Sequence, residues 1–383
     1  MVTGAYFPET SGGGLQARAV IRALHHDADF LVLTTSTDPS LPARSDEDGI
    51  EIRRIHVDVR NTASTLTAAA RLVSAFVGLA PRFDIVNLHG FSGKAIVLAA
   101  LSRLFRKRFV LTLQTSVQDE PRAVRATGAL AFWAYRSADL YLSVSPGLSR
   151  GYLEGGLPAS RLRQVRNAVE TDRFRPPAGG ERELLRRELG LPPDVPLVLF
   201  VGYFSRDKRP DVMYRAWLAN ARSDRRPGLV MIGATRAIHG EVDTRLAPTI
   251  REWAARDGVA DRLFLVEATR AIERYFRAAD LFVLPSVREG LSIALIEAMS
   301  SGLPCVASRL EGSTDVLLED QVSGLLVAPD DEAGMAAAVR LLLTDRSMAD
   351  RLGAAARATV LDRYAIDTAA SSWLGAYREL APS

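Results

Sequence analysis

The sequence of 383 residues predicts an α/β protein made of two doubly wound domains. Short apolar runs typical of strands alternate along the chain with amphipathic runs typical of helices. The strand-like runs are almost continuously apolar, which indicates parallel sheets that are buried on both faces. Nine such runs are too many for one compact unit, so the chain is expected to divide.

The strand-like runs fall into two groups. They cover residues 29–35, 83–90, 108–114 and 139–145 in the first half, and 195–202, 228–234, 261–267, 280–286 and 303–308 in the second. A short run, residues 1–7, precedes Pro8 and is expected to supply the first strand. Residues 170–196 are rich in proline, glycine and charge and lack a strand pattern, so we place the domain boundary there. Ligands of such sheets bind beyond the carboxyl ends of the strands, which predicts a site in a cleft between the domains.

Composition excludes several classes of protein. No basic segment followed by an apolar one opens the sequence and no run of 18 apolar residues occurs, so neither a signal peptide nor a membrane span is expected. The single cysteine, Cys305, rules out a disulfide within the chain. The five histidines are scattered and no cysteine cluster exists, so no zinc site is expected. We therefore expect a cytoplasmic protein with no bound metal.

Positive charge is concentrated in the first half of the chain. Residues 1–175 contain 22 Lys and Arg against 16 Asp and Glu, whereas the remainder contains 26 against 29. The densest group follows the predicted helix 95–104 and consists of Arg103, Arg106, Lys107 and Arg108. Two interpretations stay open: peripheral contact with anionic lipid, at about 1 kcal/mol per cation, or a solvated helix end whose cations suit the helix dipole. Because four charges are few for a polybasic anchor, the second is favoured.

Each domain has one turn suited to an anion. Gly12, Gly13 and Gly14 open a predicted helix that ends at Leu24, and glycines let a backbone approach a ligand closely. They do not match the G-x-G-x-x-G dinucleotide pattern, so a flexible turn is an equally good interpretation. In the second domain, Lys208 is one of only three lysines in a chain that otherwise uses arginine. A compact ammonium at a helix start suits a phosphate, with an exposed turn residue as the alternative.

The stretch "SVREGLSIALIEAMSSGLPCVAS", residues 286–308, carries two glutamates within an apolar run. Glu289 is expected in a loop, Ser292 at the N-cap of a helix 293–300, and residues 304–307 in a buried strand. Glu297 lies within that helix. Eight positions at about 100° per residue bring the two carboxylates to roughly 80° apart, so both can face one cavity above the helix N-terminus.

The order of these motifs, with "FDIVNLHG", "RQVRNAVETDRFRP", "VGYFSRDKRP" and "EGSTDVLLEDQVSGLLVAPDD", resembles the retaining nucleotide-sugar glycosyltransferases of family 4 over nearly the whole chain. The most specific element is Glu289-x7-Glu297 followed by Ala-Met-x-x-Gly-x-Pro. The resemblance implies the GT-B fold, with two Rossmann-like domains facing across a cleft. We expect an acceptor-side domain 1–170, joined by a C-terminal helix 365–383, and a nucleotide-sugar domain 171–364.

The resemblance also implies roles for individual residues. Glu289 would lie beside the donor sugar and Lys208 beside the diphosphate, which makes them the catalytic candidates, and Glu297 would accept hydrogen bonds from the ribose. Cleavage of a sugar–phosphate bond leaves an anion and an oxocarbenium-like centre, which suits such donors and a nearby carboxylate. Besides Lys208 and Glu297, the expected donor-binding residues are Gly13, Gly14, Arg206, Gly290, Leu291 and Ser292, and the acceptor-side residues are His89, Gln114 and Asp119.

Three positions depart from the family pattern. Gln114 stands where histidine is common, and it can donate a hydrogen bond but cannot titrate near neutral pH. Tyr203 stands where arginine often follows Gly202, and Arg206 is the nearest cation that might replace it. Ala168 replaces a usual glycine. For Asp119, a solvated turn is a slightly better interpretation than acceptor binding, and for His89 a structural role is as well supported as a ligand contact.

We therefore expect a retaining glycosyltransferase that moves a sugar from a UDP- or GDP-sugar to a glycan or lipid-linked acceptor in cell-envelope or exopolysaccharide synthesis. No cofactor, metal or nucleic acid is expected, since the nucleotide-sugar is a co-substrate. Two alternatives remain: a nucleotide-sugar 2-epimerase of the same fold and a non-catalytic nucleotide-sugar-binding protein. The choice of base is expected to depend on residues 233–240 and 265–274.

Overall fold

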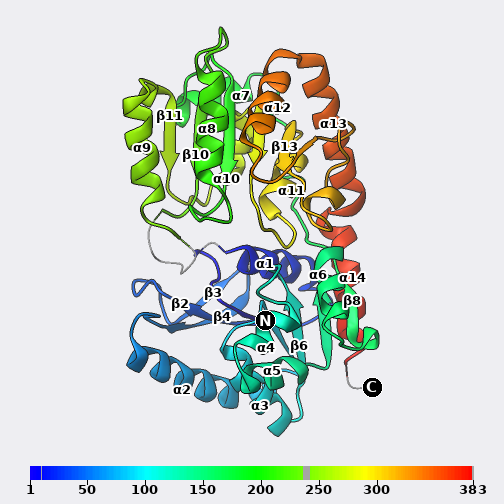
Figure 1. The fold of residues 1–383 in the computed structure, drawn as a ribbon. Helices are drawn as coiled ribbons and strands as arrows, with labels where there is room; N and C mark the ends of the chain where they lie inside the picture. Colours follow the sequence, from blue (N-terminus) through cyan, green and yellow to red (C-terminus); the bar gives the residue numbers. More distant parts are fainter. Residues whose placement is uncertain (10, 236–241, 382–383) are drawn as a thin grey trace. The chain divides into compact units, whose positions relative to one another are not determined.

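The computed structural model describes residues 1–9, 11–235 and 242–381 (Figure 1). The chain forms two compact units, Met1–Ala168 with Ile366–Ser383, and Val169–Ala365. We call them the first and the second unit. Their limits lie close to the predicted boundary at residue 170 and the predicted return at residue 365. Each unit is a sheet of mainly parallel strands with helices packed against it, as the alternating pattern predicts.

The sheet of the first unit has the strand order β3-β4-β2-β1-β5-β6-β7-β8, and every neighbouring pair except β3 and β4 is parallel. Strands β3, β4 and β8 were not predicted from the sequence. Strand β4 alternates buried and partly exposed residues instead of forming a continuous apolar run, and β8 has three residues, none of them buried. The strands are β1 Val2–Thr3, β2 Leu31–Ser36, β3 Arg44–Glu47, β4 Ile50–His56, β5 Ile85–His89, β6 Arg108–Leu113, β7 Leu140–Ser143 and β8 Leu162–Gln164.

Helix α14 brings the C-terminal part of the chain back to the first unit. Asn87 Nδ2 on β5 donates to Tyr377 Oη at 2.7 Å, and Trp373 Nε1 donates to the carbonyl oxygen of Arg166 at 2.9 Å. Both aromatic side chains are buried, so α14 completes the core of this unit. The helices are α1 Gly12–Leu24, α2 Thr62–Leu79, α3 Lys94–Leu104, α4 Pro121–Ala126, α5 Ala129–Arg136, α6 Pro146–Glu154 and α14 Ile366–Arg378.

The sheet of the second unit has the order β11-β10-β9-β12-β13-β14 and is parallel throughout. All of its central strand residues but one are buried, which explains their continuous apolar sequence. The elements are β9 Leu197–Val201, β10 Gly228–Ile232, β11 Leu263–Val266, β12 Leu281–Leu284, β13 Cys305–Ser308 and β14 Leu325–Val327, with α7 Glu181–Glu188, α8 Pro210–Ala221, α9 Leu246–Arg256, α10 Ile272–Ala278, α11 Ile293–Ser300, α12 Glu332–Thr344 and α13 Arg346–Arg363.

The segment 170–196 is more than the linker that its composition indicated. It contains α7, whose Arg186 is 5% exposed and donates from Nε to the carbonyl oxygen of Ala278 at 2.8 Å. The same guanidinium pairs with Asp280, which also accepts a hydrogen bond from the backbone of Leu197 at 2.7 Å. A buried, fully bonded arginine therefore ties this segment to the starts of β9 and β12.

Close packing of backbone on backbone fixes the start of α1. Ser11 is the N-cap and its hydroxyl accepts from Gly14 N at 3.1 Å. A Cβ added at Gly14 would lie 2.2 Å from the carbonyl oxygen of Ala5, whereas one at Gly13 would make ordinary contact with His89 Cβ at 3.6 Å. Gly14 is thus required by packing, and Gly13 has room for a methyl group.

We expect Gly14→Ala to lower the free energy of unfolding by about 1–3 kcal/mol, because the backbone of residues 5–14 must shift to relieve the overlap. Gly13→Ala, in the same helix turn, is the matched control and should change stability by less than about 0.5 kcal/mol. Urea denaturation of both variants measures the difference. Equal stability of the two would contradict the packing role of Gly14.

Candidate functional site

In the second unit, Lys208 and Glu289 form a two-pronged ion pair. Lys208 Nζ lies 2.7 Å from both carboxylate oxygens of Glu289. The side chain of Glu289 is 6% exposed and that of Lys208 is 25% exposed. A carboxylate removed from water to this extent needs a partner, and the ammonium supplies it. The two residues that the sequence analysis named as catalytic candidates are therefore brought together.

Two loops at the carboxyl ends of β9 and β12 position this pair. Val287 N donates to the carbonyl oxygen of Asp207 at 2.8 Å, and the side chains of Arg288 and Asp207 form an ion pair. The residues just before Lys208 and Glu289 are thus joined by both backbone and side chain. This double link holds the ammonium and the carboxylate in register.

The helix that follows Glu289 begins where the sequence predicts. Ser292 is the N-cap of α11, and its hydroxyl accepts from Leu295 N at 3.3 Å. Gly290, Leu291 and Ser292 are all buried and lead directly into the helix. The N-terminal end of α11, where backbone N–H groups favour an anion, therefore lies next to Glu289 in the chain.

Glu297 lies on α11 in a different environment from Glu289. Its side chain is buried, and burial raises the pKa of Glu297 to about 8. The positive charge of Arg173 opposes that rise, whereas Glu273 and Glu170 add to it. Arg173 also pairs with Glu273 at 2.8 Å. The carboxyl group of Glu297 is therefore mostly protonated at neutral pH, which the sequence pattern did not reveal.

Arg206 is not brought to the ion pair. Its side chain is 82% exposed and its guanidinium lies 3.8 Å from Asp243 Oδ2. The backbone turn between β9 and α8 directs Lys208 inward and leaves Arg206 in solvent. The idea that Arg206 supplies the charge missing at Tyr203 therefore has no support from the geometry.

In the first unit, His89 and Gln114 lie together at the carboxyl ends of β5 and β6. Gln114 Nε2 is 3.3 Å from His89 Nδ1, so the amide can donate to an unprotonated Nδ1. The imidazole is 6% exposed and stacks on Trp373 with ring centres 5.7 Å apart. Burial lowers the pKa of His89 to about 3, so the ring is neutral. His89 thus packs beneath Gln114, whose side chain is only partly buried.

Asp119 is neither a solvated turn residue nor open to an acceptor. It is 1% exposed, and its carboxylate accepts hydrogen bonds from the backbone N–H groups of Phe91 (2.6 Å), Gln114 (2.6 Å) and Thr115 (2.8 Å). Burial raises the pKa of Asp119 to about 6, although these three hydrogen bonds oppose the rise. The expectation that Asp119 contacts the acceptor is therefore corrected. Its hydrogen bonds join the loops that follow β5 and β6, and so fix the position of Gln114.

Two further residues named from the sequence lie in the first unit. Gly13, an expected donor-binding residue, lies over the end of β5, beside His89. Ala168 is buried and its N–H donates to Gln16 Oε1 at 3.1 Å, so the substitution of a usual glycine is accommodated by ordinary packing.

Lys94, one of the three lysines of the chain, was given no role from the sequence. Lys94 opens α3 after β5, and its Nζ lies 3.1 Å from the hydroxyl of Thr35 at the end of β2. Burial lowers the pKa of Lys94 to about 8. Its rarity in an arginine-biased chain is the signal that could have identified it, as it did for Lys208. An ammonium held at the strand ends by a hydroxyl is suited to an anionic group of a ligand.

The segments expected to read the base are only partly described. Residues 236–240 lie outside the described part of the chain. Within it, Thr235 donates from its backbone N and its hydroxyl to the carboxylate of Glu267, at 3.0 and 2.6 Å, which joins the two segments. Among the described residues, no group of three or more His, Cys, Asp or Glu side chains is placed to hold a metal ion.

The sequence is similar to two family models and to curated glycosyltransferases. Residues 181–359 match the family model "Glycosyl transferases group 1", and residues 11–168 match "Glycosyl transferase 4-like domain". The chain is 37% identical over 195 residues to D-inositol 3-phosphate glycosyltransferase 2 of Catenulispora acidiphila, covering 49% of this chain and 44% of that protein. It is 35% identical over 234 residues to D-inositol 3-phosphate glycosyltransferase of Xylanimonas cellulosilytica, covering 58% and 52%. The match thus spans about half the length of these relatives.

Solved structures share the fold over almost the whole chain. Sucrose-phosphate synthase from Thermosynechococcus elongatus is 21% identical with a TM-score of 0.81, covering 99% of this chain and 98% of that one. Anabaena Alr3699/HepE in complex with UDP and glucose is 18% identical with a TM-score of 0.79, covering 99% of both chains. These likenesses show the fold, which is GT-B. The two family matches, over residues 11–168 and 181–359, show that the chain belongs to the group 1 glycosyltransferases.

Proposed function

We propose that the protein is a retaining glycosyltransferase that moves a hexose from a UDP- or GDP-sugar to a hydroxyl group of an acceptor. The observation that carries this proposal is the Lys208–Glu289 pair, in which an ammonium and a buried carboxylate meet beside the start of α11. An ammonium and helix N–H groups stabilise a departing diphosphate, and a carboxylate stabilises positive charge that develops on the sugar. The UDP complexes of HepE support a UDP-linked donor.

Within this proposal, the leaving phosphate takes the proton of the attacking hydroxyl on the face from which it departs. No side chain of the first unit then has to act as a base. That agrees with a neutral, buried His89 and a Gln114 that can only offer hydrogen bonds. Charge on the diphosphate is met by Lys208 and α11, so the reaction is proposed to need no metal or cofactor.

The acceptor is proposed to be a glycan or a lipid-linked molecule of cell-envelope or exopolysaccharide synthesis, reached from the cytoplasmic side of the membrane. Lys94 favours a second candidate, a phosphorylated acceptor. Its partly buried ammonium lies at the strand ends of the first unit, and the relatives from Catenulispora and Xylanimonas are named for an inositol phosphate. No nucleic acid partner is proposed.

Incubation with labelled UDP- and GDP-sugars tests the reaction. We expect label to pass to an acceptor with retained anomeric configuration, measured by NMR, and turnover to persist in EDTA. Label that stays in an epimerised donor would indicate the 2-epimerase, and binding with no turnover would indicate a nucleotide-sugar-binding protein. Loss of turnover on chelation, restored by magnesium or manganese, would contradict the metal-independent mechanism. Inositol phosphate compared with a lipid-linked glycan distinguishes the two acceptors.

Lys208→Ala should lower kcat/KM by roughly ten- to a hundredfold, the loss expected when a charge-assisted hydrogen bond to the diphosphate is removed. It should also lower Tm, because Glu289 loses its partner. Arg206→Ala is the matched control, because it removes an exposed cation from the same turn. The kcat/KM of this variant should stay within about twofold of the wild-type value. Similar losses in both variants would mean that any cation of this turn suffices and that the Lys208–Glu289 geometry is not decisive.

Glu297 should make stability depend on pH. The folded protein keeps the proton up to a pKa of about 8, whereas an unfolded chain releases it at the model value of 4.5. Unfolding therefore releases a proton between these values, so the free energy of unfolding contributed by Glu297 falls as pH rises through that window. Glu297→Gln removes the dependence, and its Tm advantage over wild type should grow from pH 6 to above about pH 8. The exposed Glu319→Gln is the control and should show no such growth.

A further inference from the structure

Helix α2 carries an apolar face that is exposed in the described part of the first unit. Among the described residues, the segment Thr62–Arg82 is the one helix long and apolar enough to cross a membrane by length and composition, with a mean hydropathy of 1.4. Only 28% of its most apolar 18-residue window is buried, whereas a core helix would be mostly buried. Leu66, Val73 and Val77 are 68%, 38% and 44% exposed, and their spacing of seven and four residues places them on one side of the helix.

A basic cavity lies at the neighbouring end of the same unit. It has a volume of about 1150 Å³ and lies between the end of α3, the starts of β6 and β7, and α5. Seven cations line it against two carboxylates, Asp84 and Asp139. Six of the cations are Arg103, Arg106, Lys107, Arg108, Arg125 and Arg136. The group of four that the sequence singled out is therefore part of a larger basic site.

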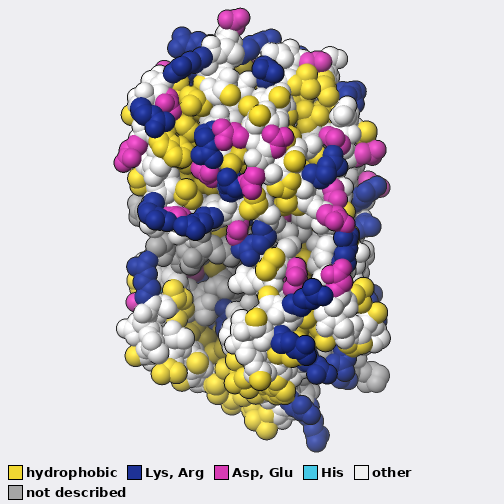
Figure 2. Space-filling view, in the orientation of Figure 1, with side chains coloured by type: hydrophobic (Ala, Val, Ile, Leu, Met, Phe, Trp, Pro, Cys, Tyr) yellow, Lys and Arg dark blue, Asp and Glu magenta, His cyan; other side chains and the backbone are white. Residues whose placement is uncertain are grey.

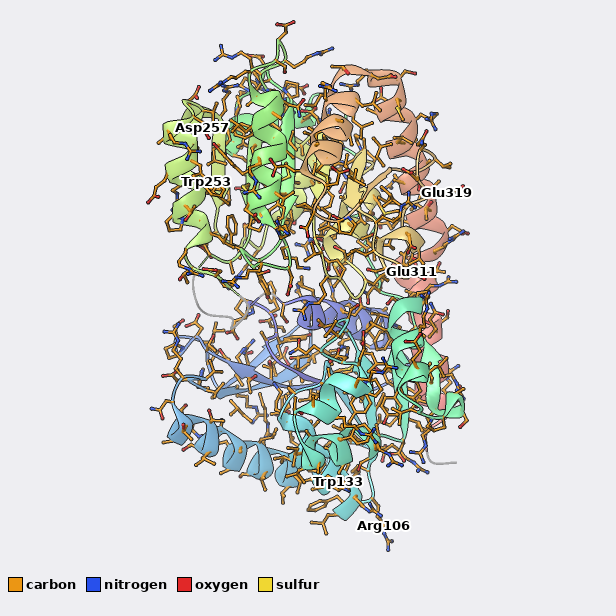
Figure 3. The ribbon with its side chains drawn as sticks, in the orientation of Figure 1. Arg106, Trp133, Trp253, Asp257, Glu311 and Glu319 are labelled. Carbon is orange, nitrogen blue, oxygen red and sulfur yellow. The ribbon has the colours of Figure 1, made fainter. Side chains whose placement is uncertain are left out.

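Exposed apolar side chains lie at and beside this cavity. Trp133, which lines it, is 38% exposed, and Leu104 and Leu130, which neighbour lining residues in the chain, are 73% and 59% exposed. Lys107 Nζ lies 5.4 Å from the ring centre of Phe83, at the end of the α2 segment, and α2 packs on α3. Figure 2 shows apolar side chains gathered over this part of the first unit with Lys and Arg beside them, and Figure 3 shows Arg106 and Trp133 projecting from the same end.

We propose that this surface, the exposed face of α2 together with the basic cavity and its apolar rim, seats the protein on an anionic phospholipid bilayer. An apolar helix face beside clustered cations suits the boundary between acyl chains and charged headgroups. A tryptophan at the rim is also typical of that boundary. Cations alone would suit any polyanion, whereas the exposed leucines and valines need an apolar partner.

The position of the surface has a consequence for the acceptor, which rests on the proposed function. Arg108 starts β6 and Gln114 follows its end, so the bilayer contact and the acceptor side are separated by the length of that strand, about 20 Å. An acceptor anchored in the same bilayer would need an extended glycan to reach Gln114. The bilayer contact itself requires no assumption about the donor or the reaction.

Flotation of the full chain with lipid vesicles tests the proposal without any substrate. We expect binding to vesicles of phosphatidylcholine with phosphatidylglycerol, no binding to phosphatidylcholine alone, and release by high salt. Each lost cation should lower the affinity for the vesicles roughly fivefold. The variant Arg103→Glu/Arg106→Glu, which loses two, should therefore bind at least about 25-fold more weakly. The control Arg187→Glu/Arg225→Glu makes the same change in net charge on exposed residues of the second unit and should bind like wild type.

The apolar face is tested separately with Val73→Ser/Val77→Ser, which should also weaken binding to anionic vesicles while Tm stays close to that of wild type. Absence of binding to anionic vesicles, equal binding to neutral vesicles, or equal loss in the control variant would each overturn the proposal. Glycosyl transfer to a soluble acceptor should be unchanged in the Arg103→Glu/Arg106→Glu variant, so failure of the membrane contact and failure of the proposed function are distinguishable.

Discussion

The central strands of both sheets are buried residue after residue, and successive residues of a strand point to opposite faces, so helices cover each sheet on both sides. A charge placed within such a strand would lose water without gaining a partner. The charged groups of the candidate site therefore lie where the strands end. Lys208 and Glu289 follow β9 and β12, and Gln114 follows β6. The burial of the sheets thus determines where the chemistry can occur.

Three buried carboxyl groups show how differently the fold uses the same group. Glu289 lies at the strand ends and is paired with an ammonium 2.7 Å away. Asp119 is compensated by three backbone N–H groups and serves the conformation of the loops. For Glu297, among the described residues, the positive charge of Arg173 does not offset burial, which is the dominant influence and raises the pKa of its carboxyl group to about 8.

The first unit has different chemistry at its two ends. The carboxyl ends of its strands carry Gln114, His89 and Lys94, which are partly or fully buried and suit small polar ligands. The amino ends of β6 and β7 carry exposed cations and apolar side chains over a wide surface. The proposed acceptor side and the proposed bilayer surface thus lie at opposite ends of β6.

Local patterns were enough to predict the two α/β units, limits within a few residues of those observed, and the helix Ile293–Ser300 with Ser292 as its N-cap, since hydrophobic period and capping chemistry are local. They also drew attention to Lys208 and Glu289, because a rare lysine and a charged residue in an apolar run stand out in the sequence. Which groups are buried, and what compensates them, became known only from the folded structure. Arg206 and Lys208 are two positions apart, yet one is in solvent and the other pairs with Glu289, 81 residues away. Asp119 resembles a turn residue in sequence. In the folded chain it is buried, and its carboxylate accepts hydrogen bonds from three backbone N–H groups. Burial and pairing depend on contacts between distant segments, which local patterns do not encode.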